Sequence, residues 1–114
     1  MKAFVTGSTG LLGSNVARQL LSAGYEVKAM ARSAEKGQQF LGDTTAEIVV
    51  GDMLDITAFA HHMADCDVLF HVAAYFKEYN GVDEQGETML QKINVDGTIE
   101  LLETAKAEGV HNVI

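Results

Sequence analysis

The sequence is poor in cysteine, in basic residues and in long apolar stretches, and each shortage excludes a class of protein. Its one cysteine, Cys66, cannot form an internal disulfide, and His61 and His62 lack a second ligand pair at the spacing of a metal site. With 8 Lys and Arg residues against 16 Asp and Glu residues, the net charge is −8, so the chain lacks a basic face for nucleic-acid phosphates. The longest apolar stretch, residues 68–76, is too short to span a membrane. We therefore expect a soluble, cytoplasmic protein without a nucleic-acid, membrane or metal partner.

Apolar residues alternate between short runs and helical spacing along the chain. The short runs predict five strands, at residues 3–5, 25–31, 48–50, 67–72 and 110–114. The helical spacing predicts helices at residues 11–23, 34–41, 56–63 and about 85–108. Ser33 and Asp55 are the expected caps of the second and third helices, Gly24 and Gly109 end the first and last, and residues 77–86 predict an exposed loop.

Strands that alternate with helices at this spacing form βαβ units, in which right-handed crossovers place helices on both faces of a parallel sheet. The third and fourth strands are continuously apolar, as expected for strands covered on both faces. We therefore predict an α/β chain with a Rossmann-type, doubly wound parallel sheet. Residues 1–114 form one domain in this prediction.

The first predicted strand leads directly into a glycine-rich turn. Residues 6–13 read T-G-x-x-G-x-x-G between a strand and a helix, which is the context that a dinucleotide pyrophosphate site requires. Gly7 permits the tight turn, Gly10 lets the pyrophosphate approach the backbone, and Gly13 lets the helix pack closely on the sheet. The helix N-terminus supplies N–H groups and positive potential in an otherwise acidic chain. The alternative is a glycine-rich turn without a ligand.

The end of the second predicted strand selects between the two nicotinamide dinucleotides. NAD-binding domains usually carry an acidic residue there for the ribose 2′-OH, whereas this chain has Arg32 followed by Ser33. A guanidinium suits a 2′-phosphate through charge-assisted hydrogen bonds, and the Ser33 hydroxyl adds a further donor. We therefore expect NADP(H) rather than NAD(H), the alternative being that Arg32 is a solvated surface charge.

Four segments then occur in a fixed order, at residues 6–13, 51–53 (GDM), 67–74 (DVLFHVAA) and 94–102 (NVDGTIELL). Together they make the chain similar to the extended short-chain dehydrogenase/reductases, that is, to the NAD-dependent epimerase/dehydratase family and its dihydroflavonol reductase-like branch. The resemblance covers essentially the whole chain. It implies a cofactor site formed by Gly7, Thr9, Gly10, Leu11, Leu12, Gly13, Arg32, Ser33, Asp52, Met53, Val72, Ala73 and Ala74.

The resemblance also implies individual roles. Asp52 and the Met53 backbone bracket the adenine, and residues 72–74 line the ribose and nicotinamide. Asn94 matches a helix asparagine that supports the active site, the alternative being a capping or packing role. His71 matches a packed strand residue of the family rather than a catalytic one. The helix at 85–108 contributes to dimerisation in the family, which predicts a homodimer.

The catalytic Y-x-x-x-K of the family is absent from these 114 residues, because residues four positions after the three tyrosines are Ala29, Tyr79 and Asp83. We therefore expect an N-terminal portion, truncated at the start of the fifth strand and inactive alone. The resemblance implies a parent enzyme that transfers hydride between nicotinamide and a carbonyl or alcohol of a small-molecule substrate. The alternatives are a non-catalytic NAD(P)-binding sensor or, disfavoured by Arg32, a different Rossmann enzyme such as a methyltransferase.

Overall fold

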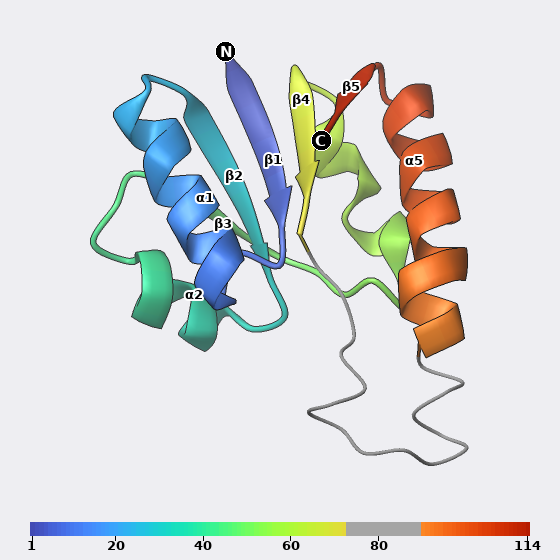
Figure 1. Ribbon diagram of the computed structural model, residues 1–114, viewed down its shortest axis with the longest axis horizontal. Helices are drawn as coiled ribbons and strands as arrows, with labels where there is room; N and C mark the ends of the chain where they lie inside the picture. The colour runs from blue at the N-terminus through green and yellow to red at the C-terminus, as the bar shows by residue number, and fades with distance from the viewer. Residues whose placement is uncertain (73–89) are drawn as a thin grey trace.

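The computed structural model describes residues 1–72 and 90–114 (Figure 1). The described residues form five strands, β1 (Lys2–Thr6), β2 (Glu26–Ala31), β3 (Glu47–Val50), β4 (Val68–His71) and β5 (Asn112–Val113). They also form the α-helices α1 (Leu11–Ser22), α2 (Ala34–Leu41) and α5 (Thr98–Ala107), the 3₁₀ turns η1 (Ile56–Ala58) and η2 (Ala60–Met63), and the π-helical segment η3 (Leu90–Gly97). The predicted loop at 77–86 and the predicted helix start at 85 lie outside the described residues.

The five strands form one parallel sheet in the order β3-β2-β1-β4-β5. The chain moves outward from β1 through β2 to β3, then returns to the other side of β1 to add β4 and β5. The direction of winding therefore reverses between β1 and β4, where Thr6 is the register partner of His71. In open sheets of this kind, ligands bind at the carboxyl ends of the strands beside such a switch point.

Two hydrophobic cores lie on the two faces of the sheet, which confirms the Rossmann-type architecture. One face packs against α1 and α2, and its buried residues are Val5, Ala17, Val27, Ala29 and Leu41. The other face packs against α5 and the two 3₁₀ turns, and its buried residues include Phe4, Met30, Phe59, Leu69 and Leu101. Figure 1 shows α1 and α2 on one side of the strands and α5 on the other. Neighbouring strand residues such as Phe4 and Val5 alternate between the cores because strand side chains alternate in direction.

The helix ends follow the sequence signals closely. The Ser33 hydroxyl caps α2 by accepting a hydrogen bond from the Lys36 N–H at 3.2 Å, as predicted. Gly24 and Gly109, which follow α1 and α5, have φ values of 92° and 90°. These left-handed conformations favour glycine, which explains why both helices end where the sequence predicts.

Several predictions about the elements were wrong in detail. Asp55 makes no side-chain capping hydrogen bond, and the described part of the helix predicted at about 85–108 begins with the π-helical η3 before α5. The predicted helix at 56–63 consists of two 3₁₀ turns, because the segment closes i→i+3 bonds such as Phe59 N–H to Ile56 C=O. Val50 is 56% exposed although its strand reads as covered on both faces, because β3 is the outer strand of the order. The fifth strand begins at Asn112 rather than at Val110, whose N–H bonds to the Ala105 carbonyl of α5, and backbone hydrogen bonds of Ile114 with Leu69 and His71 continue its pairing with β4.

Within the described ranges, no helix is long and apolar enough to cross a bilayer. In the same ranges, no three His, Cys, Asp or Glu side chains gather where they could hold a metal ion.

Candidate functional site

The glycine loop, residues 7–13, joins the carboxyl end of β1 to the amino end of α1 at the switch point (Figure 1). Gly7 has a φ of 66°, so the chain leaves the strand through a conformation that other residues rarely adopt. Its carbonyl accepts a hydrogen bond from the Gly10 N–H at 3.1 Å, which closes the turn. The tight turn predicted at Gly7 is therefore present.

Gly13 and Gly10 lack a side chain for different physical reasons. A Cβ added at Gly13 would lie 1.9 Å from the Gly7 carbonyl oxygen, so the packing of α1 against the loop itself excludes any larger residue. A Cβ added at Gly10 would meet the same oxygen at 3.5 Å, an ordinary contact, and Gly10 has a φ of −80°. The fold therefore requires glycine at position 13, and it leaves a methyl-sized space at position 10.

The amino end of α1 presents backbone donors to that space. Its first intrahelical bond runs from the Ser14 N–H to the Gly10 carbonyl, so the N–H groups of Leu11, Leu12 and Gly13 precede the hydrogen-bonded ladder. Gly10 supplies no capping side chain, and the first turn carries no acidic residue that would repel an anion. Leu11 and Leu12 are 85% and 66% exposed, which places apolar side chains beside these donors. The arrangement suits an anion attached to an organic group.

Buried hydroxyl groups fix the loop, and sequence reasoning missed them. Ser8 is fully buried, and its hydroxyl donates to the Met30 carbonyl of β2 at 2.8 Å. The fully buried Thr6 hydroxyl accepts from the Val72 N–H at 2.9 Å and shares a hydrogen bond with His71 Nδ1, also at 2.9 Å. The sequence feature that could have indicated both hydrogen bonds is the pair of hydroxyl residues, Thr6 and Ser8, on either side of Gly7.

His71 is half-buried and hydrogen-bonded at both ring nitrogens, because its Nε2 lies 3.1 Å from the Thr98 hydroxyl. Burial lowers the pKa of the imidazole, because the charged form loses hydration. The structure thus places His71 in a packed network, as the sequence analysis expected. No role had been predicted for Thr98.

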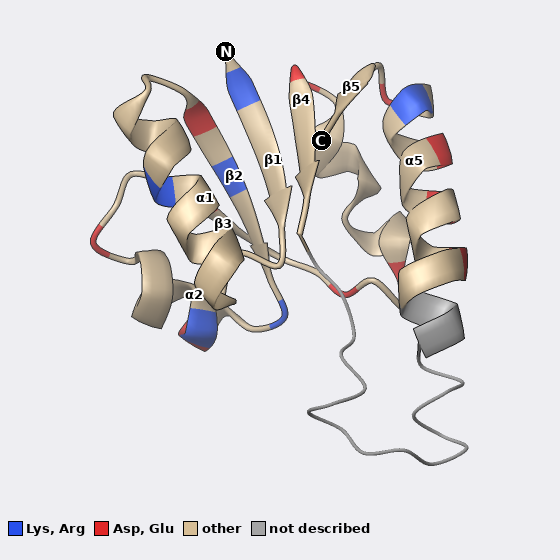
Figure 2. Ribbon diagram, in the orientation of Figure 1, with Lys and Arg blue, Asp and Glu red and all other residues tan. Residues whose placement is uncertain are grey.

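The turn from β2 to α2 lies at the same edge of the sheet (Figure 2). It carries Arg32, whose side chain is exposed, and the half-buried Ser33. The Ser33 oxygen accepts from Lys36 N–H, which leaves its hydroxyl hydrogen free to donate to a further group. Arg32 therefore lies next to the amino end of a second helix, whose positive potential favours an anion, although Glu35 in its first turn opposes this.

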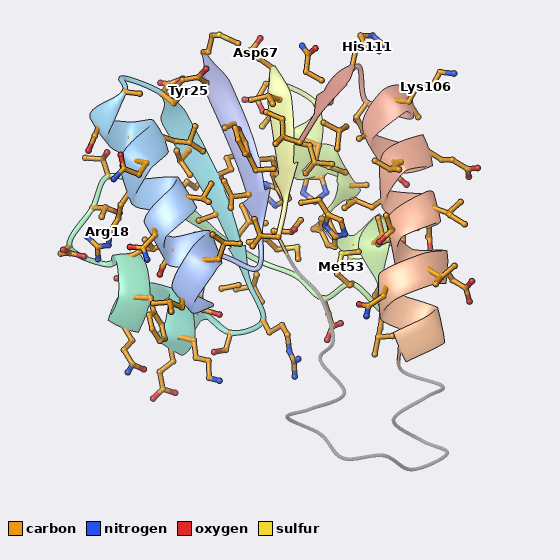
Figure 3. All side chains as sticks on the ribbon, viewed as in Figure 1. Arg18, Tyr25, Met53, Asp67, Lys106 and His111 are labelled. Atoms are coloured by element: carbon orange, nitrogen blue, oxygen red, sulfur yellow. The ribbon has the colours of Figure 1, made fainter. Side chains whose placement is uncertain are left out.

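Asp52 and Met53 follow β3 and are held differently from the glycine loop. One Asp52 carboxylate oxygen accepts from the Leu54 N–H at 2.9 Å, which leaves the second oxygen for another donor. Met53 is buried in the core between the sheet and α5 (Figure 3). Its side chain also lines an open hollow of about 390 Å³, together with Leu54, Asp96, Gly97 and Glu100.

The remaining predicted residues are described only in part. Val72 is half-buried directly after β4, and its N–H is the one that binds Thr6. Asn94 is exposed in η3, one turn before α5. Ala73 and Ala74 lie outside the described residues. The structure thus brings the ends of β1, β2 and β4 to one edge, which is where the predicted cofactor contacts originate.

A glycine loop between the first strand and first helix of a doubly wound sheet, with its helix donors open at the switch point, defines a nucleotide-binding Rossmann fold. Residues 3–114 match the NAD dependent epimerase/dehydratase family, and the chain belongs to this family.

Relatives with catalytic descriptions match the whole chain. A putative dihydroflavonol 4-reductase of Synechocystis sp. is 34% identical over 111 residues, which cover 97% of this chain and 31% of that protein. A 4-hydroxy-2-methyl-3-oxo-4-farnesyl-3,4-dihydroquinoline-1-oxide ketoreductase of Stigmatella aurantiaca is 34% identical over 116 residues, covering 100% of this chain and 32% of that protein. The chain thus spans about a third of the length of these curated relatives.

Solved structures share the fold closely. A short-chain dehydrogenase/reductase superfamily protein from Agrobacterium tumefaciens with bound NAD has a TM-score of 0.78 and 26% identity, covering 99% of this chain and 31% of that one. A UDP-glucose 4-epimerase of Thermotoga maritima has a TM-score of 0.81 and 25% identity, covering 99% and 36%. The chain therefore corresponds to the nucleotide-binding portion of this oxidoreductase and epimerase family, and the family's NAD dependence supports a nicotinamide dinucleotide as the cofactor class.

Proposed function

We propose that this chain forms the cofactor half of an enzyme that transfers hydride between a nicotinamide dinucleotide and a carbonyl or alcohol group of a small molecule. The observation that carries the proposal is the open amino end of α1, where Gly10 leaves space for a ligand that the fold itself does not fill. When bound, the dinucleotide supplies or accepts the hydride. The names of the relatives, a 4-reductase and a ketoreductase, support this class of reaction.

The described residues fit such a cofactor. In the proposed arrangement, the N–H groups of residues 11–13 bind the pyrophosphate, and Gly7 and Thr9 shape the loop around it. Asp52 and the backbone of Met53 bind the adenine beside the hollow at the end of β3. Val72, with Ala73 and Ala74, lines the ribose and nicotinamide side. Asn94 takes a supporting role near the substrate.

Arg32 selects NADP(H) over NAD(H) in this proposal. Its exposed guanidinium follows β2 and lies beside the amino end of α2, where Ser33 still has a hydroxyl hydrogen to donate. A 2′-phosphate would receive charge-assisted hydrogen bonds there, whereas a 2′-hydroxyl would gain little.

Arg32→Ala tests this preference. We expect NADPH binding to weaken by about 1–3 kcal/mol, because charged hydrogen bonds are lost, while NADH binding changes little. Fluorescence titration of the complete protein with each cofactor measures both. Lys106→Ala is the matched control, because it removes one positive charge at the far end of α5 (Figure 3). Equal losses of NADPH and NADH affinity in Arg32→Ala would contradict the assignment.

The catalytic part of the proposal has a separate test. The complete protein should oxidise NADPH in the presence of a reducible carbonyl compound drawn from a ketone and aldehyde panel, followed by absorbance of the reduced nicotinamide. Tight NADPH binding without turnover of any carbonyl in the panel, and no reduction of NADP⁺ by the corresponding alcohols, would favour the non-catalytic sensor over the enzyme.

We also propose that the protein is a homodimer that pairs through α5. Val95 of η3 and Ile99 and Leu102 of α5 are 45%, 54% and 40% exposed, so they supply an exposed apolar surface along α5 and the turn before it. A two-fold axis would bury this surface of one copy against the same surface of its partner. Light scattering on Ile99→Glu tests this. A wild-type dimer that becomes a monomer in the variant supports the proposal, and an unchanged mass contradicts it.

A further inference from the structure

His71 connects three elements that converge at the switch point. Thr6 is the last residue of β1, His71 is the last residue of β4, and Thr98 is the first residue of α5. The imidazole lies between the two hydroxyl groups, with Nδ1 2.9 Å from the Thr6 oxygen and Nε2 3.1 Å from the Thr98 oxygen. A single side chain thus joins the strand that carries the glycine loop to the first turn of a helix 27 residues further along the chain.

We infer that His71 and Thr98 are positioning residues, which dock the first turn of α5 against β1 and thereby set the affinity of the glycine loop for the dinucleotide. This inference rests on the proposed function, because it concerns the same cofactor site. It adds two residues that would not touch the cofactor.

The hydrogen bonds that link Thr6 through His71 to Thr98, here called the bridge, depend on one another. The Thr6 oxygen accepts from the Val72 N–H, and it also bonds to the ring. A neutral imidazole donates from one nitrogen and accepts at the other, so the Thr6 and Thr98 hydroxyls take opposite roles toward the ring. Removing the Thr98 hydroxyl therefore leaves a half-buried ring nitrogen without this partner and weakens the arrangement at Thr6.

The first three residues of α5 are not buried in the apolar core. Leu101, at the end of the first turn, and Ala105, one turn later, are fully buried, whereas Ile99 is about half exposed. Thr98 is half-buried and directly follows the buried Gly97 of η3. The bond from Thr98 to His71 therefore adds a polar contact at the very start of the helix, before its first core residue.

Both ends of the bridge adjoin the proposed cofactor site. Thr6 directly precedes Gly7, whose carbonyl oxygen bonds to Gly10 and would be 1.9 Å from any Cβ at Gly13. Because this packing leaves no free space, a displacement of Thr6 also displaces the glycine loop. At the other end, Thr98 follows Gly97, which lines the hollow beside Met53. The bridge thus holds the pyrophosphate side and the adenine side of the site at a fixed separation.

The test is a matched set of variants in the complete protein, titrated with NADPH. Thr98→Val removes the hydroxyl and keeps the shape, Thr98→Ser keeps the hydroxyl, and Thr104→Val makes the same change at a half-buried position later in α5. We expect the dissociation constant to rise about three- to tenfold in Thr98→Val, in line with the loss of one hydrogen bond, and to stay near the wild-type value in the other two. Thr98→Ala replaces the valine variant if that variant does not fold.

Rescue by serine separates positioning from general stability. Equal affinity in Thr98→Val and wild type would overturn the inference, and so would a serine variant as weak as the valine variant. An equal loss in Thr104→Val would also overturn it, because any disturbance of α5 would then suffice. If the wild-type protein binds neither NADPH nor NADH, the proposed function fails. That result differs from a failure of the inference about His71 and Thr98, in which the wild-type protein binds the cofactor and only the variants behave otherwise than expected.

Discussion

The glycine loop at residues 7–13 and the β3–β4 connection at residues 51–67 both join strand ends, but they are stabilised in opposite ways. In the loop, backbone geometry decides the structure, and the donors at the start of α1 precede the helical ladder. In the connection, polar groups bond to other protein groups, as Asp52 does to the Leu54 N–H and Asp65 to Lys2 and Lys28, and large side chains such as Phe59 fill the core. The backbone donors of the first region are open to a ligand, whereas most of the second region's contacts stabilise the fold.

This difference shows how a small domain separates binding from stability. Unmet backbone donors in the loop would destabilise a buried turn, so they are tolerated only where solvent or a ligand can satisfy them. Beyond the proposed adenine contacts at Asp52 and Met53, the connection fills the core, and its buried side chains carry a share of the fold that the loop does not. Substitutions in the two regions should accordingly affect different measurements.

The largest expected effect on stability is that of Phe59→Ala. Phe59 is fully buried and stacks on Phe4 with ring centroids 5.9 Å apart, so its removal leaves a cavity in the core. We expect a loss of about 3–5 kcal/mol in the free energy of unfolding, measured by urea denaturation. Phe40→Ala, at a position 37% exposed on α2, is the control and should lose much less. Similar losses in the two variants would contradict the claim that the buried side chains of the connection stabilise the fold.

Gly10→Ala should instead affect binding. The added methyl group meets the Gly7 oxygen at an ordinary 3.5 Å, so stability should change by about 1 kcal/mol at most. The same methyl group occupies the space of the proposed pyrophosphate, so NADPH affinity should fall by about ten- to a hundredfold, or roughly 1.4–2.8 kcal/mol. Gly13→Ala is the matched comparison and should lower stability first, by about 2 kcal/mol or more, because its Cβ has no room. Unchanged NADPH affinity in Gly10→Ala would mean that the cofactor does not occupy the space beside Gly10.

The smallest expected effect comes from Asp65, near the end of the β3–β4 connection. Its carboxylate lies 2.7 Å from Lys2 Nζ and 2.8 Å from Lys28 Nζ, and hydrogen bonds to these cations hold its pKa well below the usual range. A lowered pKa in the folded state stabilises the protein above the unfolded value of about 4, and this contribution is lost as the pH falls further. Because Asp65 is 54% exposed, Asp65→Asn should cost less than about 1 kcal/mol at pH 7.

Urea denaturation of Asp65→Asn and wild type at pH 7 and at about pH 3 measures this difference. Glu47→Gln, at the exposed start of β3, provides the control. The gap between wild type and Asp65→Asn should narrow at the lower pH. A gap that widens there would contradict the role of the two lysines.

The two regions also differ in how far the sequence predicted them. The turn at Gly7, the close packing at Gly13 and the Ser33 cap were predictable, because each follows from a local backbone requirement that only a few residue types meet. The 3₁₀ turns at 56–63 were not, since Ile56, Phe59 and Met63 have a spacing that suits an α-helix equally well. The bond between His71 and Thr98 joins residues 27 positions apart, and a single sequence gives no sign of such a contact.

The most direct test of the account is to follow backbone amide resonances of the complete protein by NMR while NADPH is added. Its central claim is that the open amino end of α1 binds the pyrophosphate. It predicts the largest shifts at the N–H groups of Leu11, Leu12 and Gly13, with small changes at residues 56–63. Saturable binding of NADPH that leaves the three loop amides unmoved would contradict the claim.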